Sequence, residues 1–297
     1  PPPPVNPPSL PESYPSDGLL VWYCPSGYDK SSSLGSESVW NDCSGNGNGA
    51  TLVGTGFYWE ENDGNGATNA VPALYGTTQS RINFAWTDSG QGPRSFPGLL
   101  IKLESTVCSV TRYSGVTKKR ILNGDGANWL HGHHNGFAGV AFYESNDGTG
   151  WKTYNSPNSE FAGKSNVFPE SDWVIMCATT TGQMKLVNGV DQGRASGGAN
   201  VELSLYVNSG YENSDFGIVE LVVWERGLSD SELRGASDHL MAKMGMFPRP
   251  KIDTGIGAIS GNCGTNTYAS AGWELADGSS GVAGDDTDVK WERWVAM

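Results

Sequence analysis

The sequence predicts an all-β fold, a sandwich of two antiparallel sheets with one short helix after the last strand. Three observations support this prediction. The chain of 297 residues contains 41 Gly and only 17% charged residues, a composition typical of short strands joined by tight turns. Short apolar runs alternate with clusters of Gly, Asn, Asp and Ser at the spacing of a sandwich. Eleven Trp supply enough large apolar side chains for its core.

The composition divides the chain into three parts. Residues 1–15 include eight prolines, which favour an extended polyproline II spacer without a core of its own. Residues 16–247 carry the strand and helix patterns and form the predicted domain. Residues 248–297 contain eight Gly and little periodicity, so we expect this tail to dock on the domain or on a neighbouring subunit.

Ten apolar runs within the predicted domain have the length and turn-rich borders of strands. In chain order they are Gly18–Tyr23, Ala70–Tyr75, Arg81–Ala85, Gly98–Leu103, Arg120–Leu122, Gly139–Tyr143, Trp173–Thr179, Met184–Val187, Val201–Val207 and Gly217–Trp224.

One amphipathic helix is predicted after the last of these runs. Ser229 is a suitable N-cap, and Glu232 completes a capping box three residues later. Gly245 can end the helix in the left-handed conformation, and Pro248 prevents its continuation. The apolar stripe that would close the sandwich consists of Leu233, Ala236, Leu240 and Met244.

The charge of the chain limits its partners. A net charge of −13 argues against nucleic acid, whose phosphates require clustered Lys and Arg. The basic run Lys118–Arg120 is interpreted as a solvated edge. No apolar run approaches the roughly 20 residues of a membrane helix, so membrane insertion is not expected. The chain begins with Pro1 rather than Met, which suggests a processed protein or part of a longer one.

Five cysteines, none in a C-x-x-C spacing, indicate disulfides of an oxidising compartment rather than a zinc site. Five cysteines with one left out allow fifteen pairings. We expect Cys24–Cys43 and Cys108–Cys177, because each pair lies on segments with strand patterns. Cys263 would then be left for an intersubunit bond, or remain a buried free thiol.

Several segments resemble signatures of laminin-G-like, concanavalin A-like jelly-roll domains over roughly residues 17–246. They are Trp40–Thr51 and Ile218–Leu233 at the two ends, with Gly18–Tyr23, Asn123–His133, Trp173–Met176 and Lys185–Gly189 between. The resemblance implies two antiparallel sheets in a jelly-roll sandwich, and it implies a fold rather than a function. Cys43 stands where such domains commonly carry an aliphatic residue, which supports a local disulfide to Cys24.

Metal binding is considered at two places. The resemblance implies a structural calcium ion near the loop that carries Asp42, Asn46 and Asn48, with Glu220 of the last strand as a second carboxylate. Alternatively, these side chains only cap tight turns. His131 and His133 would face one side of a strand, as two ligands should. No acidic third ligand lies near them at a fixed spacing, so we interpret these histidines, with His134, as support for the fold.

Carbohydrate enters the predictions in two ways. Trp59, Trp129 and Trp151, together with Trp86, are candidates for stacking on sugar rings, although most tryptophans belong to cores. The proline-rich head is similar to stretches of hydroxyproline-rich cell-wall glycoproteins of algae and plants. Since the chain contains no Asn-x-Ser/Thr sequon, we expect any glycan to be O-linked, with candidate sites at Pro2, Pro3, Pro4, Pro7 and Pro8.

Enzyme motifs are missing: the sequence contains neither a Gly-x-Ser-x-Gly elbow nor the Glu-x-Asp-x-x-Glu strand pattern of jelly-roll glycosidases, and no catalytic residue is assigned. The first functional hypothesis is therefore a non-enzymatic extracellular structural glycoprotein. It would assemble with copies of itself, for example by adding a strand such as Val289–Val295 to a neighbour's sheet. The alternative is a lectin-like module that binds glycans, with or without calcium.

Overall fold

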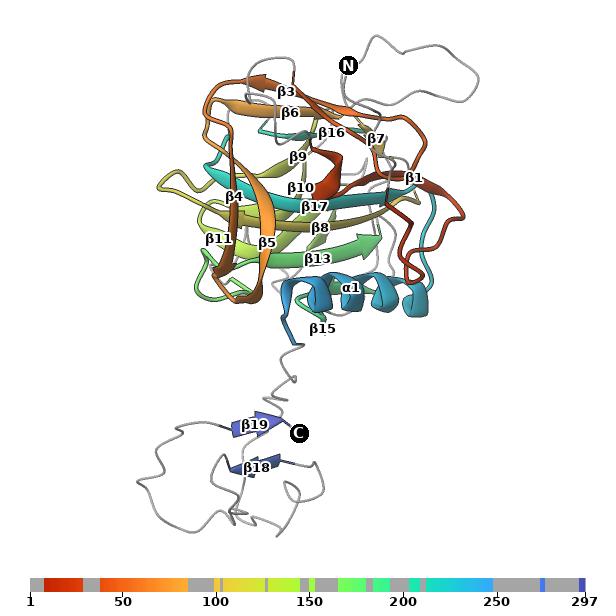
Figure 1. Cartoon of the computed structure of the whole chain (residues 1–297), viewed down its shortest axis with the longest axis vertical. Helices are drawn as coiled ribbons and strands as arrows, with labels where there is room; N and C mark the ends of the chain where they lie inside the picture. Colours follow the sequence, from red (N-terminus) through yellow and green to blue (C-terminus); the bar gives the residue numbers. More distant parts are fainter. Residues whose placement is uncertain are drawn as a thin grey trace. The chain divides into compact units, whose positions relative to one another are not determined.

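The computed structural model describes residues 8–28, 38–84, 99–101, 104–125, 128–144, 150–152, 165–179, 184–192, 203–208, 212–247, 273–275 and 294–296. The chain divides into two units, Pro1–Pro250 and Lys251–Met297. The described residues of the first unit form two antiparallel sheets and one α-helix (Figure 1), as the sequence predicts. No helix in the described part of the chain is long and apolar enough to cross a membrane.

The two sheets follow the antiparallel pairing of a sandwich. In hydrogen-bonding order, the first contains β15 (Val190–Asp191), β14 (Lys185–Val187), β13 (Val174–Thr179), β8 (Thr106–Tyr113), β17 (Phe216–Trp224), β5 (Ala67–Gly76) and β4 (Tyr58–Gly64), with β1 (Leu19–Tyr23) also paired to β17. The second contains β12 (Gly150–Lys152), β11 (Phe137–Glu144), β10 (Trp129–His134), β9 (Leu122–Asp125), β16 (Leu203–Val207), β6 (Ser80–Phe84), β3 (Ala50–Gly54) and β2 (Val39–Trp40), with β7 (Leu99–Ile101) paired to β16.

Each of the ten predicted runs overlaps a strand, although the run Arg120–Leu122 meets β9 only at its last residue. The segment Lys185–Gly189, quoted above for the jelly-roll resemblance, ends in the turn between β14 and β15, where Asn188 and Gly189 have φ values of 45° and 73°. Two successive positive φ angles match the right-handed twist of a hairpin. Strands β4 and β8 overlap none of the ten predicted runs.

Strand β17 is buried on both faces, which explains its continuous apolar sequence. Ile218 and Leu221 belong to the core between the sheets, whereas Val219 packs in a second core on the helix side. A β-bulge lies between Ile218 and Glu220 in the pairing with β8. An extra residue in one strand changes which face a side chain takes, and the partners of Glu220 all lie on the helix side.

Helix α1 (Asp230–Met244) covers the outer face of the first sheet (Figure 1). Both hydrogen bonds of the predicted capping box form between Ser229 and Glu232, and Gly245 adopts the left-handed C-cap. The predicted apolar stripe is buried. Strand β5 caps the other end, since the Asn69 amide donates to the carbonyls of Ala242 and Lys243 at 3.2 and 3.0 Å. The Lys243 carbonyl belongs to the last turn, whose carbonyls lack N–H partners within the helix, and the Ala242 carbonyl also accepts from the backbone N–H of Gly245.

The described part of the proline-rich head packs against the domain instead of extending from it as a spacer. Tyr14 is 2% exposed and makes edge-to-face contacts with Trp22 and Trp224. The Trp224 indole donates a hydrogen bond of 2.8 Å to the carbonyl of Pro15. We call residues 8–15 the N-terminal strap. Its contacts place it within the folded unit, upstream of the boundary at residue 16 that the composition suggested.

Disulfides join Cys24 to Cys43 and Cys108 to Cys177, the pairing chosen from the fifteen possibilities. Cys263 lies outside the described residues. In the second unit, β18 (Trp273–Leu275) pairs with β19 (Trp294–Ala296). The segment Val289–Val295 was proposed to join a neighbour's sheet. Its last two residues, Trp294 and Val295, are paired with β18 of the same chain.

Candidate functional site

The predicted calcium loop is held by its own hydrogen bonds. The Asp42 carboxylate accepts from the backbone N–H groups of Trp22, Ser44 and Asn48 and from the Ser44 hydroxyl, at 2.8 to 3.1 Å. The amide of Asn46 donates to the carbonyl of Leu19 at 2.8 Å. Such contacts are those of side chains that fix tight turns, the alternative considered from the sequence.

Glu220 does not join Asp42 in a ligand set. Its carboxylate is fully buried on the helix side of β17, where it accepts from the Tyr14 hydroxyl at 2.9 Å, the Trp22 indole at 2.6 Å and the Lys243 ammonium. No group of three or more His, Cys, Asp or Glu side chains that could hold a metal occurs among the described residues. Calcium binding stays a prediction.

His131 and His133 of β10 lie in the core between the sheets, as their interpretation as fold-supporting residues requires, whereas His134 is only partly buried and lies 3.6 Å from a carboxylate oxygen of Glu212. His131 and His133 are 0% exposed. His131 bonds to the Tyr143 hydroxyl and to the carbonyl of Met176, and its ring stacks with Trp129. Burial lowers the pKa of His131 to about 4 and that of His133 to about 3, because an apolar environment disfavours the charged imidazolium.

These pKa shifts predict acid sensitivity. In the unfolded chain both histidines take up a proton near the ordinary pKa of about 6.5, whereas in the folded protein they remain neutral down to about pH 4 and 3. The unfolded state therefore binds more protons in this window, so the free energy of unfolding falls as the pH drops below about 6.5. Urea unfolding at successive pH values measures this slope. His133→Phe should flatten it, and an unchanged slope would contradict the assignment.

The structure separates the candidate tryptophans. Trp129 is fully buried, so its prediction as a sugar-stacking residue is wrong: its indole stacks on His131 and Tyr143 inside the core. Trp59 is half-buried and packs against the core, with an edge contact to Tyr28. Trp151 lies in β12, but its side chain is outside the described part. Trp86 and the candidate glycosylation sites Pro2, Pro3, Pro4 and Pro7 also lie outside it.

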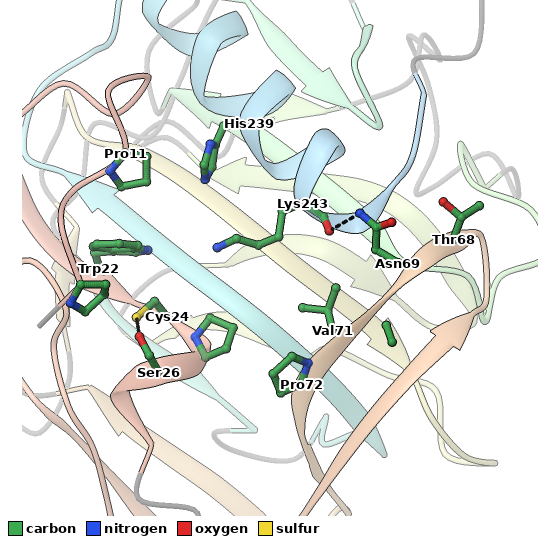
Figure 2. Close-up of a pocket in the computed structure, with 13 residues that line it drawn as sticks. Pro11, Trp22, Cys24, Ser26, Thr68, Asn69, Val71, Pro72, His239 and Lys243 are labelled. Atoms are coloured by element: carbon green, nitrogen blue, oxygen red, sulfur yellow. Dashed lines mark hydrogen bonds between the residues drawn. The ribbon is translucent and has the colours of Figure 1, made fainter. Parts of the chain in front are cut away.

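A shallow groove of about 940 Å³ lies between the N-terminal strap, β1, β5 and the last turns of α1 (Figure 2). Its walls are largely apolar, and prolines come from three different segments. The described residues that line it are Pro8, Pro11, Trp22, Cys24, Pro25, Ser26, Thr68, Asn69, Ala70, Val71, Pro72, His239 and Lys243. Pro8 thus lies at the groove, although it was predicted as a glycosylation site.

Polar groups surround the apolar walls of the groove. Ser26 contributes a hydroxyl and Asn69 an amide oxygen, since the amide nitrogen of Asn69 donates to the helix carbonyls. Figure 2 shows the side chains of His239 and Lys243 extending from the helix toward the groove. Lys243 is held by the buried Glu220 carboxylate. Burial, followed by the nearby Lys243 charge, lowers the pKa of His239, which favours the neutral ring at neutral pH. The arrangement can offer both apolar contact and hydrogen bonds to a ligand.

The sequence alone does not identify the groove as a binding site. One signal was present, because His239 and Lys243 are four residues apart and therefore share one face of the predicted helix. Trp22 was treated only as part of an apolar strand. Its place beside the groove depends on the N-terminal strap, and a proline-rich segment carries no periodicity that would predict such packing.

Comparisons with known proteins report on the fold. Neither a protein-family model nor a curated protein matches the chain. Among solved structures, the binding domain of Paraclostridial Mosquitocidal Protein 1 is similar, with a TM-score of 0.51 and 14% identity over 76% of this chain. The chain is a jelly-roll β-sandwich. The match covers 53% of the toxin domain, so the chain spans about half the length of that structure.

Two further solved structures have TM-scores just below 0.5. Domain 4 of an extracellular arabinanase from Geobacillus stearothermophilus, solved in complex with arabinotriose, has a TM-score of 0.49 and 14% identity, covering 74% of this chain and 98% of that one. The botulinum neurotoxin serotype D binding domain has a TM-score of 0.49 and 13% identity, covering 76% of this chain and 53% of that one. At these identities such similarities concern the arrangement of strands, and the laminin-G resemblance is not singled out by them.

Proposed function

We propose that the chain is an extracellular carbohydrate-binding module whose ligand occupies the groove beside helix α1. The observation that carries the proposal is the composition of the groove: Pro11, Val71 and Pro72 form apolar walls, with the hydroxyl of Ser26 and the amide of Asn69 in the same lining. A sugar ring has an apolar C–H face and hydroxyl groups at its edge. An apolar concave surface with a few fixed polar groups is the usual design of a small-ligand site.

Other observations fit this proposal without fixing it. The structure contains two disulfides, and disulfides persist in oxidising, extracellular environments. The similar mosquitocidal toxin domain is itself called a binding domain. We propose no catalytic role, because the described residues that line the groove include no Asp or Glu, and Glu220, which holds Lys243, is fully buried and accepts hydrogen bonds from three protein donors.

The hypothesis of a structural subunit stays a prediction. Deleting the proline-rich head and measuring self-association would not test it cleanly, because part of that head packs into the fold. Deletion of residues 1–15 would remove Tyr14, which is buried in the helix-side core. Loss of assembly after that deletion could therefore result from unfolding alone. The recognition hypothesis can be tested by point substitution at an exposed position.

Ser26→Trp should abolish glycan binding. Ser26 is exposed at the groove, so an indole there fills the groove without disturbing the core. A glycan array identifies the ligand for the full chain, and calorimetry then compares the variants. Val116→Trp is the matched control, because Val116 is 96% exposed and does not line the groove. Equal loss of binding in both variants, or normal binding by Ser26→Trp, would refute the assignment of the groove.

A further inference from the structure

The groove differs in charge from the rest of the chain. The protein contains 32 acidic and 19 basic residues, with a net charge of −13. Yet the described residues that line the groove include the positively charged Lys243 and no Asp or Glu. A random sample of this surface would favour acidic side chains. The groove is therefore a local exception that disfavours cationic ligands and complements anionic ones.

Lys243 is fixed in place but has binding capacity left. An ammonium group has three N–H donors, and one of them is directed to the Glu220 carboxylate. The Lys243 side chain is 24% exposed, whereas that of Glu220 is 0% exposed. Of this ion pair, only the positive member is presented to the groove. The Tyr14 hydroxyl and the Trp22 indole both donate to Oε1 of Glu220, whereas the Lys243 ammonium binds Oε2.

Resting on the proposed carbohydrate-binding function, we propose that the groove binds an acidic sugar, a uronic acid unit of an anionic polysaccharide. Its carboxylate accepts a charge-assisted hydrogen bond from Lys243. A uronic acid carries the carboxylate at the edge of its ring, so the C–H face remains free to lie on Pro11, Val71 or Pro72, which line the same groove (Figure 2). The ligand carboxylate would share the ammonium with Glu220.

If the ligand carboxylate and Glu220 share the Lys243 ammonium, removing the charge of Glu220 should strengthen ligand binding. An ion pair that only stabilises the fold would not have this effect. Glu220→Gln removes the competing negative charge and keeps an amide oxygen that can accept from Tyr14 and Trp22. The affinity for an acidic sugar should therefore rise severalfold. In the double variant Glu220→Gln/Lys243→Met the groove has lost its ammonium without leaving a buried charge, so the preference for the acidic sugar should disappear.

The probe is trigalacturonic acid, and its methyl ester is the uncharged control with the same rings. Both are titrated into the full chain and the two variants by calorimetry at low salt. We expect the acid to bind at least about tenfold more tightly than the ester, the range of a hydrogen bond to a charged group. The double variant should bind both equally.

The outcomes separate the two proposals. Equal or tighter binding of the ester, an acid preference that survives in the double variant, or weaker acid binding by Glu220→Gln would each overturn the acidic-sugar assignment. Neutral glycan binding that Ser26→Trp still abolishes would leave the carbohydrate-binding function standing. If neither the two probes nor any glycan of the array binds in a Ser26-dependent manner, both proposals fail.

Discussion

Lys243→Met should lower the free energy of unfolding by about 3 to 5 kcal/mol, the cost of removing one partner from a buried ion pair. The Glu220 carboxylate is 0% exposed, and in this variant it would lose its only cationic partner among the described residues. The Tyr14 hydroxyl and the Trp22 indole would remain as hydrogen-bond donors, but neither carries a charge. Urea unfolding followed by tryptophan fluorescence measures the loss.

The double variant Glu220→Gln/Lys243→Met distinguishes a buried charge from lost packing. A glutamine at position 220 is neutral and can accept the same two hydrogen bonds through its amide oxygen. Replacing both members of a buried ion pair is often close to neutral, so the double variant should recover most of the lost stability. A loss below about 1 kcal/mol in Lys243→Met, or a double variant less stable than the single one, would contradict this account.

The sequence predicted the helix ends correctly, because each end is determined by residues that are close together in the chain. The capping box of Ser229 and Glu232 and the left-handed Gly245 are set by residues within one or two turns of each helix end. The hairpin corner at Asn188 and Gly189 likewise needs two residues that tolerate positive φ. Strand β4 was missed because its sequence, with Glu60 and Glu61 side by side, lacks a continuous apolar run.

The candidate site could not be predicted in the same way. Glu220 was expected to join Asp42 at a metal, because sequence spacing does not reveal on which face of β17 it lies. The bulge after Ile218 and the contacts with Tyr14 and Lys243 decide this. These partners are 206 and 23 residues away in sequence. A carboxylate in an apolar strand indicated a special environment, but only the tertiary structure identifies the partners.

Removal of the Cys108–Cys177 disulfide should cost about 4 kcal/mol on the chain-entropy model. The two cysteines are directly opposite on β8 and β13 and are separated by 69 residues. Without the bond, the unfolded chain regains the freedom of that long loop, whereas the folded state keeps the ladder between the strands. The variant Cys108→Ala/Cys177→Ala, compared with the unaltered chain in urea under non-reducing conditions, measures the difference.

The other disulfide is the matched comparison, because it closes a loop with a sequence separation of only 19. The same model gives about 3 kcal/mol for Cys24→Ala/Cys43→Ala. Both pairs lie in the helix-side core, so the loss of buried sulfur is similar and the loop length distinguishes them. A larger loss for the shorter loop would mean that the disulfide Cys24–Cys43 acts mainly on the folded state. It would then stabilise the wall of the groove at Cys24 and the loop of Asp42, and groove binding should weaken in that variant as well.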